Sequence, residues 1–203
     1  MTDKKRWEDR YINGQTTWDI SKHDFNLETV VTYTPIKNCK VLEIGCGTGD
    51  NSIWLAQHRF QVTGVDIAEP AIQKAIEKSS ASDVSCTFIV RDFMENMVEG
   101  APFDFVFDRG CFHSFDSVED RSHYTLNVAA HLTGEGLWLT IAGSADDPPR
   151  DIGPPRRSAQ DIILAVEPHF KILSLYTSHF ESNRPIPARA WVCLMRKRDN
   201  SFR

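Results

Sequence analysis

Short apolar runs alternate with longer amphipathic segments from Lys40 onward, and this alternation limits the possible folds more than any other feature of the chain. Such short runs are typical of buried strands, and the segments between them have apolar residues at the spacing of one helix face. Strands that are separated by helices are joined by crossovers and become parallel neighbours. The sequence therefore predicts an α/β fold with a mostly parallel sheet and helices on both faces.

The individual elements can be placed along the chain. Parallel strands are expected at 40–44, 61–66, 86–90, 103–107 and 136–141, with helices at 50–58, through 71–76 and at 118–132. A loop rich in Asp, Pro and Arg follows at 145–157, and Ser158 is the expected N-cap of a further helix. Two last strands, at 171–176 and 188–195, are joined by a short connector with two prolines, so they are expected to pair antiparallel. The sheet is thus predicted to have seven strands and a C-terminal hairpin.

Composition disfavours several classes of function. The chain has 203 residues, enough for one domain with a sizeable core. Its net charge of -5 disfavours general binding to nucleic acid, which depends on Lys and Arg beside phosphates. No apolar run is long enough to cross a bilayer and the polar N-terminal segment has no signal-peptide core, so we expect a soluble, cytoplasmic protein. Five cysteines without C-x-x-C spacing predict reduced thiols and no metal site.

The most informative stretch is the glycine-rich loop Glu43-Ile44-Gly45-Cys46-Gly47-Thr48-Gly49, which follows the first predicted strand. Glycines at alternate positions let the backbone turn sharply and approach a ligand without interference from a Cβ atom. The free N–H groups of the next helix point to the same place and favour an anionic group. The residues predicted to bind a ligand here are Glu43, Gly45, Cys46, Gly47 and Gly49.

Acidic residues end the next strands at the same edge. Asp66, with Ile67 beside it, ends the second strand, where doubly wound folds place a carboxylate on ribose hydroxyls. Asp92 ends the third strand and is expected to accept from an adenine amino group, while the ring of Phe93 packs on the base. Asp108 ends the fourth strand. Because parallel strands end at one edge of the sheet, these residues and the glycine loop are predicted to line one crevice.

Such a crevice suits a cationic nucleoside better than a dinucleotide. A dinucleotide site needs G-x-G-x-x-G and room for a pyrophosphate, whereas this loop reads G-x-G-x-G and holds neither Lys nor Arg. With its ordered acids and closing hairpin, the stretch from Lys40 to Arg198 resembles the class I S-adenosylmethionine-dependent methyltransferases. The resemblance implies a Rossmann-like domain with S-adenosylmethionine as cofactor, bound by the glycine loop, Asp66 and the Arg91-Asp92-Phe93 stretch.

The N-terminal segment resembles a narrower group, the thiopurine, thiol and tellurite-resistance-type methyltransferases. The residues that carry this resemblance are Trp7, Tyr11, Gly14, Trp18 and Asp19. Thr17 stands where the group usually has proline. In that group the segment folds over the bound cofactor, so the resemblance implies a lid at residues 1–30, with Trp18 at the cofactor, and a methyltransferase domain at 31–203. The alternative is that the tryptophans only plug the helix layer.

The string Asp108-Arg109-Gly110-Cys111-Phe112-His113 is similar to one found in small-molecule members of this group. Asp108 is predicted to contact the methionine part of the cofactor, and Arg109 to anchor a loop. His113 is a candidate general base or acceptor-orienting group, with a histidine held by backbone as the alternative. Cys111 is not expected to be a nucleophile, because direct transfer needs no covalent intermediate. The arginines that either select an acidic acceptor or are merely solvated are Arg150, Arg156 and Arg157.

These predictions favour methyl transfer to a small molecule, such as a thiol or another soft nucleophile, by a monomer or homodimer. Nucleic acid and membrane partners are not expected. Three rivals stay open: a non-catalytic S-adenosylmethionine-binding module, an NAD(P)-linked oxidoreductase with the same glycine loop, and an RNA methyltransferase.

Overall fold

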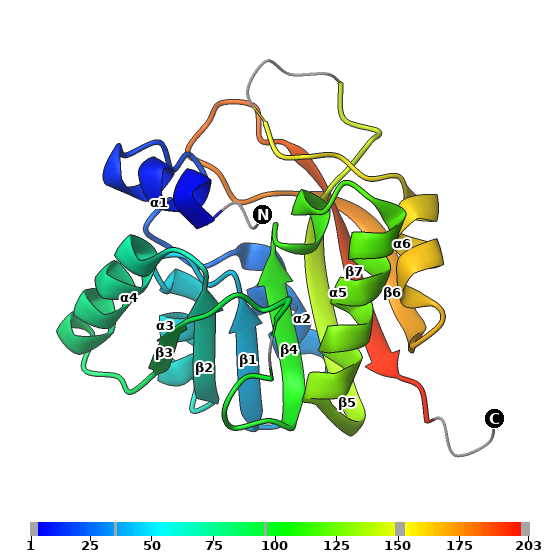
Figure 1. The fold of residues 1–203 in the computed structure, drawn as a ribbon, viewed down its shortest axis with the longest axis horizontal. Coiled ribbons are helices and arrows are strands. Elements are labelled where there is room, and N and C mark those ends of the chain that lie inside the picture. The colour runs from blue at the N-terminus through cyan, green and yellow to red at the C-terminus, as the bar shows by residue number, and fades with distance from the viewer. Residues whose placement is uncertain (1–3, 35, 96, 149–152, 200–203) are drawn as a thin grey trace.

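A seven-stranded sheet forms the centre of the computed structural model, which describes residues 4–34, 36–95, 97–148 and 153–199. The strand order is β3-β2-β1-β4-β5-β7-β6 (Figure 1). The parallel strands are β1 (Lys40–Ile44), β2 (Gln61–Asp66), β3 (Thr87–Val90), β4 (Phe103–Arg109) and β5 (Leu132–Gly143). The antiparallel strands are β6 (Phe170–His179) and β7 (Arg189–Lys197), with β7 paired to both β5 and β6. The predicted fold class, with its C-terminal hairpin, is confirmed.

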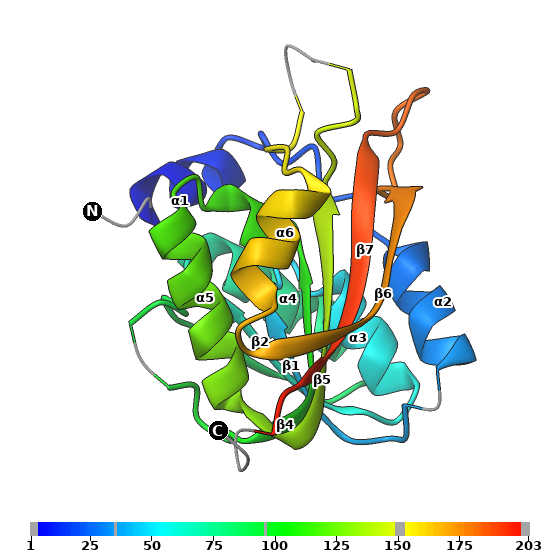
Figure 2. The ribbon, with the colours of Figure 1, turned by 90° about the vertical axis from the view of Figure 1, so that its right-hand side faces the viewer.

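Helices cover both faces of this sheet, as Figure 2 shows. One face carries α2 (Phe25–Tyr33) and α3 (Asp50–Gln57), and the other carries α5 (Val118–His131) and α6 (Ala159–Val166). The remaining helices are α1 (Lys4–Ile12), α4 (Glu69–Ala81) and the short 3-10 turn η1 (Phe112–Ser114). Each face has its own apolar core, built around Leu27 and Leu55 on one side and around Tyr124 and Ile162 on the other.

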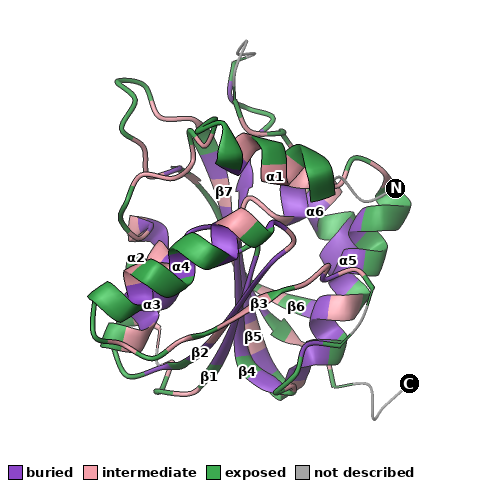
Figure 3. Cartoon of the chain, turned by 60° about the vertical axis from the view of Figure 1, so that its left-hand side comes forward, coloured by how far each residue is buried: buried purple, intermediate pink, exposed green. Residues whose placement is uncertain are grey.

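Burial follows this layering. The inner strands are buried, whereas the outward turns of α1 and α4 are exposed (Figure 3). The predicted N-cap at Ser158 is confirmed: its side chain accepts from the N–H of Asp161, whose own carboxylate accepts from the Ser158 N–H. This reciprocal capping satisfies two groups that the start of a helix leaves free. Within the described ranges, no helix has the length and apolar character needed to cross a membrane.

Four strands, β4 to β7, are longer than predicted, and the difference in β4 affects the site. β4 continues two residues past Phe107 because Asp108 and Arg109 still pair with Thr140 and Ile141 of β5. Asp108 therefore lies within the sheet instead of at its edge. The carboxyl ends of β1, β2 and β4 lie at the upper edge of the sheet in Figure 1, and α1 lies over that edge.

Candidate functional site

The glycine loop joins β1 to α3 at the carboxyl edge of the sheet. Gly45, Gly47 and Gly49 have φ angles of 65°, 55° and 84°, in the left-handed region that residues with a Cβ rarely adopt. The N–H of Gly47 donates to Oδ2 of Asp66 over 2.9 Å, which ties the loop to the end of β2. A Cβ at Gly47 would lie only 2.9 Å from the hydroxyl oxygen of Tyr11. The loop therefore needs glycine both for its conformation and for the close approach of α1.

Two of the predicted acids lie at or just after the ends of neighbouring strands of the sheet, and Asp66 contacts the loop directly. Burial raises the pKa of Asp66, whose Oδ1 accepts from the N–H of Ala68 over 2.9 Å. Oδ1 of Asp92 accepts from the N–H of Met94, but its Oδ2 is buried and has no hydrogen-bond partner in the described part of the chain. A buried carboxylate oxygen without a donor is costly, so such an atom indicates a ligand that supplies one. Both acids remain candidates for binding a nucleoside.

Glu43, which we predicted to face the ligand, points into the interior instead. Its side chain accepts from Nδ2 of Asn51 over 2.9 Å and from the hydroxyl of Ser52. Burial raises the pKa of Glu43 to about 7. The reason is strand geometry: side chains alternate between the two faces of a strand, and that of Glu43 points to the face covered by α3. Its role is corrected from ligand binding to holding the first turn of that helix.

Asp108 is corrected in the same way. It is 0% exposed, and its Oδ1 accepts from the N–H groups of Cys111 and Phe112 over 3.2 and 3.0 Å. Its Oδ2 accepts from Nε1 of Trp138 over 2.9 Å. Burial raises the pKa of Asp108 to about 6. With its oxygens occupied inside the protein, Asp108 shapes the turn after β4, and the expected contact with the methionine part of a cofactor is not available to it.

The other residues predicted to bind the ligand near the loop differ in where their side chains lie. Phe93 packs between Tyr124 and His131, with ring centroids 5.3 and 4.8 Å apart, so its ring belongs to the core and cannot cover a base as predicted. Ile67 is half-buried immediately after Asp66 and stays a candidate for packing on the nucleoside. The thiol of Cys46 is buried and faces the carbonyl of Gly47 at 3.8 Å.

The N-terminal segment lies against the glycine loop. Nε1 of Trp18 donates to the hydroxyl of Tyr11 over 3.2 Å, and Oδ2 of Asp19 accepts from the hydroxyl of Thr48 over 3.1 Å. A cavity of about 50 Å³ remains between the segment and the loop. The residues around it include Trp18, Asp19, Gly45, Cys46, Gly47 and Arg109. Trp18 therefore lies at the mouth of the crevice, against the glycine loop.

Lys78 also reaches the loop, although no sequence feature singles it out. Its Nζ extends from α4 and donates to Thr48 over 2.7 Å and to both carboxylate oxygens of Asp50. The carboxylate of Asp19 lies 3.6 Å away. Two acids thus balance this cation, and the crevice retains the acidic character inferred from the sequence. Lys78 is 30 residues from Thr48 in the chain, and only the tertiary fold brings them together.

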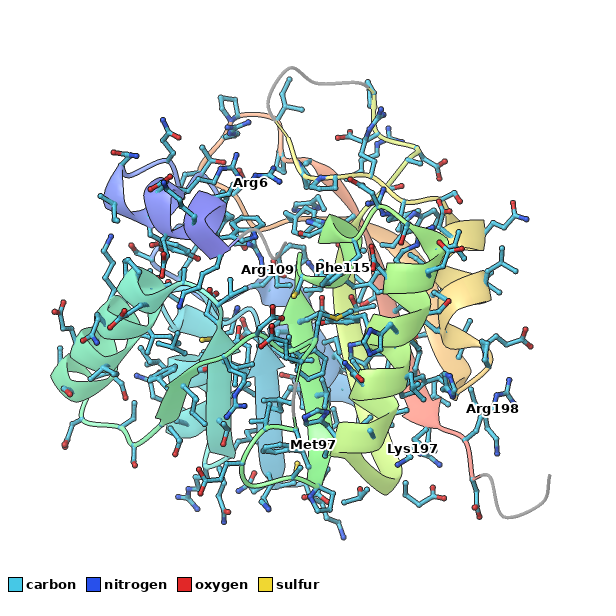
Figure 4. All side chains as sticks on the ribbon, viewed as in Figure 1. Arg6, Met97, Arg109, Phe115, Lys197 and Arg198 are labelled. Atoms are coloured by element: carbon cyan, nitrogen blue, oxygen red, sulfur yellow. The ribbon has the colours of Figure 1, made fainter. Side chains whose placement is uncertain are left out.

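Arg109 is the last residue of β4 and lines the cavity, and His113 follows in the short turn η1. Nδ1 of His113 accepts from the N–H of Gly143 over 2.8 Å. Burial, followed by the charges of Arg157 and Arg109, lowers the pKa of His113 to about 3. The prediction that Arg109 anchors a loop agrees with its bonds to the carbonyls of Trp18 and Glu181. In Figure 4 Arg109 lies at the upper edge of the sheet, opposite the end where Met97 and Lys197 are labelled.

The described arginines of the loop at 145–157 donate hydrogen bonds to backbone carbonyls of the protein. Nη1 of Arg156 donates to the carbonyl of Asp147 over 2.7 Å, and Nη2 of Arg157 donates to the carbonyl of Phe115 over 3.0 Å. Arg150 lies outside the described residues. Among the described residues no cluster of His, Cys, Asp or Glu could hold a metal ion, and the cysteines are free.

Comparisons with known proteins agree on one domain type. Residues 41–136 match the family described as methyltransferase domain. An uncharacterised methyltransferase of Schizosaccharomyces pombe is 39% identical over 89 residues, which are 44% of this chain and 61% of that protein. Thiocyanate methyltransferase 1 of Brassica oleracea is 27% identical over 175 residues, 83% of this chain and 75% of that protein.

A solved structure shares the fold across most of the chain. It is described as converting a disulfide bond into a thioacetal group during echinomycin biosynthesis, and it matches with a TM-score of 0.81 at 23% identity. The match covers 92% of this chain and 86% of the other. The fold of this chain is therefore shared over nearly its whole length. The sequence match to the Schizosaccharomyces relative covers only 61% of that protein.

Proposed function

We propose that this chain acts as a class I S-adenosylmethionine-dependent methyltransferase and transfers a methyl group from S-adenosylmethionine to a small, soft nucleophile of the thiolate class. The observation that carries the cofactor assignment is the buried Oδ2 of Asp92, which lacks a donor within the described chain. An adenine amino group is a donor of the required kind. Asp66, beside the glycine loop, still has lone pairs for ribose hydroxyls.

The charge balance of the crevice supports the same cofactor. Lys78 is already paired with Asp50 and Asp19, so it is not a free partner for a pyrophosphate. When bound, S-adenosylmethionine supplies a methyl group on a positively charged sulfur. The residues that would hold it are Trp18, Gly45, Cys46, Gly47, Gly49, Asp66, Ile67 and Asp92. The aromatic rings of the segment at 1–30 exclude water from this charge and offer it a cation–π surface, which makes the segment a lid on the domain at 31–203.

The protonation state of His113 supports an acceptor of the thiolate class. Because an amide N–H can only donate, the bond from Gly143 makes Nδ1 an acceptor and leaves the proton of the neutral ring on Nε2. With its pKa lowered to about 3, the ring stays neutral and cannot take a proton from an acceptor at neutral pH. His113 acts as a hydrogen-bond donor that orients the acceptor instead of as a base. The favoured acceptor therefore arrives already ionised, as a thiolate readily does.

The thiol of Cys111 does not compete with such an acceptor. It lies beside Gly45, and a Cβ on that glycine would come within 3.4 Å of the sulfur. Burial and the nearby carboxylate of Asp108 raise the pKa of Cys111 far above its ordinary value. The thiol is therefore protonated and weakly nucleophilic at neutral pH. The relative named thiocyanate methyltransferase 1 supports an acceptor of the soft anionic type.

A methyl-transfer assay tests the proposal. The purified chain is incubated with methyl-labelled S-adenosylmethionine and single acceptors: hydrosulfide, thiocyanate, thiophenol, phenol and aniline. Labelled product is expected with the sulfur nucleophiles and at most traces with phenol and aniline, and Asp92→Ala is expected to reduce the rate at limiting cofactor. Cofactor binding without transfer to any acceptor would point to a binding module, and preferential methylation of phenol would contradict the role given to His113.

A further inference from the structure

A buried ion pair between Arg109 and Asp24 joins parts of the chain that are distant in sequence. Nε of Arg109 donates to Oδ2 of Asp24 over 2.6 Å, and the two side chains are only 12% and 0% exposed. Charge-assisted bonds of this kind are short and directional, and removing one partner leaves the other charge buried and unpaired. The ion pair therefore holds the side chains of Arg109 and Asp24 in one geometry.

The guanidinium of Arg109 extends this junction to two covering segments. Its Nη1 donates to the carbonyl of Trp18 in the N-terminal segment over 3.3 Å. Its Nη2 donates to the carbonyl of Glu181 in the connector between β6 and β7 over 2.8 Å. The same group lies 5.1 Å above the ring of Phe180. One side chain thus holds both the lid and the connector to the end of β4.

Asp24 extends the junction toward the glycine loop. Its Oδ2 also accepts from the N–H of Glu181 over 3.3 Å. Its own N–H donates to Oδ1 of Asn51 over 2.9 Å. Asn51 is in the first turn of α3, directly after the loop that begins at Gly45. A ligand that orders the loop and this turn therefore acts on the same group of contacts that holds the connector.

Arg109 also lies between the cavity at the glycine loop and the rings of Phe180 and His113. On one side it lines the cavity together with Trp18 and the glycine loop. On the other side it packs on Phe180, whose ring meets that of His113 edge-on at 5.8 Å. Because His113 is the residue assigned to orient the acceptor, the guanidinium connects the cofactor side with the acceptor side.

We propose that Arg109 is a positioning residue that couples cofactor binding to the placement of the connector at 180–188 over the acceptor side. The proposal rests on the proposed function, because it takes the ligand of the glycine loop to be the cofactor. Coupling of this kind is reciprocal: whatever orders the connector also strengthens cofactor binding, and the cofactor orders the connector. Arg109→Lys keeps the positive charge but loses the planar fork that reaches three oxygens at once.

Hydrogen exchange measured by mass spectrometry tests this coupling without an activity readout. The amides of Phe180 and Glu181, which donate to the carbonyl of Ala188 and to Asp24, report on the connector. In the wild-type chain, S-adenosylhomocysteine is expected to slow their exchange. In Arg109→Lys this slowing is expected to disappear, and the Kd for S-adenosylhomocysteine to rise about tenfold, as for the loss of one charged hydrogen bond. Arg196→Lys, at an exposed surface ion pair with Glu135, is the matched control and is expected to behave like wild type.

The outcomes separate this inference from the function on which it rests. Equal slowing in the wild type and in Arg109→Lys, or no slowing in a wild-type chain that binds S-adenosylhomocysteine, would overturn the coupling and leave the function intact. Loss of slowing in Arg196→Lys would also overturn it, because the effect would not be specific to the junction. A wild-type chain that does not bind S-adenosylhomocysteine would contradict the proposed function itself.

Discussion

The N–H of Gly143 donates to Nδ1 of His113 over 2.8 Å, and this bond decides which nitrogen of the ring carries the proton. A neutral imidazole has one donor and one acceptor, so the only hydrogen that the ring can donate is the one on Nε2. Gly143 is held in place in turn, because its carbonyl accepts from the N–H of Arg157 over 2.8 Å. The tautomer of His113 is therefore set by the backbone of β5 and the loop that follows it.

The pH dependence of the reaction is expected to show no histidine titration. With thiocyanate, which stays ionised, kcat/KM should show no inflection from His113 between about pH 5 and 8, because the pKa of His113 is lowered to about 3. His113→Ala should lower the rate without changing the shape of the profile. A wild-type rate that falls with a midpoint near the ordinary histidine pKa, and a His113→Ala variant without that midpoint, would show that His113 acts as a base.

Asp92 is expected to select the amino group of adenine. Its unpaired Oδ2 can accept a hydrogen bond but cannot donate one. The wild-type chain should bind S-adenosylhomocysteine more tightly than S-inosylhomocysteine, in which oxygen replaces the amino group, by about 1–3 kcal/mol. Asp92→Asn, whose amide can donate, should shrink or reverse this preference. Calorimetry with both ligands measures it, and equal preferences in the two proteins would remove Asp92 from the adenine site.

Glu43 is expected to make the stability of the chain depend on pH. Its pKa is about 7 in the folded state, above its ordinary value of 4.5. A raised carboxyl pKa contributes stability that is fully present below the lower value and is lost as the pH rises through the higher one. Glu43→Gln keeps a neutral side chain at every pH, so its free energy of unfolding relative to wild type should increase between about pH 4.5 and 7, by roughly 1–3 kcal/mol in total.

Urea unfolding of the two proteins at several pH values measures this difference directly. A difference that stays constant with pH would show that the pKa of Glu43 is the same in the folded and the unfolded chain, and would contradict the effect of its burial. S-adenosylhomocysteine binding should be unaffected by the substitution, because the side chain holds α3 and does not face the ligand.

Replacing Gly47 in the glycine loop is expected to destabilise the protein, whereas replacing Gly134 in β5 is not. Gly47→Ala places a residue with a Cβ at a φ of 55° and brings that atom within 2.9 Å of the Tyr11 hydroxyl oxygen. The left-handed conformation alone costs about 1–2 kcal/mol. Gly134→Ala is the matched control, since a Cβ there meets nothing within 4 Å. Thermal unfolding should show a lower Tm for Gly47→Ala only. Adding Tyr11→Phe should restore part of the loss, and failure to do so would show that the clash does not contribute.

Elements set by local pattern were predictable from the sequence. The strands at Lys40–Ile44 and Gln61–Asp66 have the predicted bounds because an apolar run followed by glycine or an acid marks a strand end clearly. The helix cap at Ser158 and the placement of the glycine loop follow from equally local chemistry. Asp66 ends β2 and Asp92 follows β3 at the same edge of the sheet as that loop, because parallel strands end at one edge.

Side-chain directions and contacts between distant segments were harder to predict from the sequence. Glu43 and Asp108 point inward because a carboxylate in or next to a strand faces the side set by its register, and β4 extends two residues beyond its expected end. Phe93 turns into the core because Tyr124 and His131 of α5 receive it there. The contacts of Lys78 and Asp24 depend on segments far away in the chain and leave no local pattern.

Calorimetric titration of the wild-type chain with S-adenosylhomocysteine and, separately, with NAD⁺ tests the central claim most directly, with Asp66→Ala as the matched variant. The structure predicts one S-adenosylhomocysteine bound per chain, weakened in Asp66→Ala by about 1–3 kcal/mol, and no binding of NAD⁺. Binding of NAD⁺ without S-adenosylhomocysteine would contradict the assignment of the crevice to a cationic nucleoside.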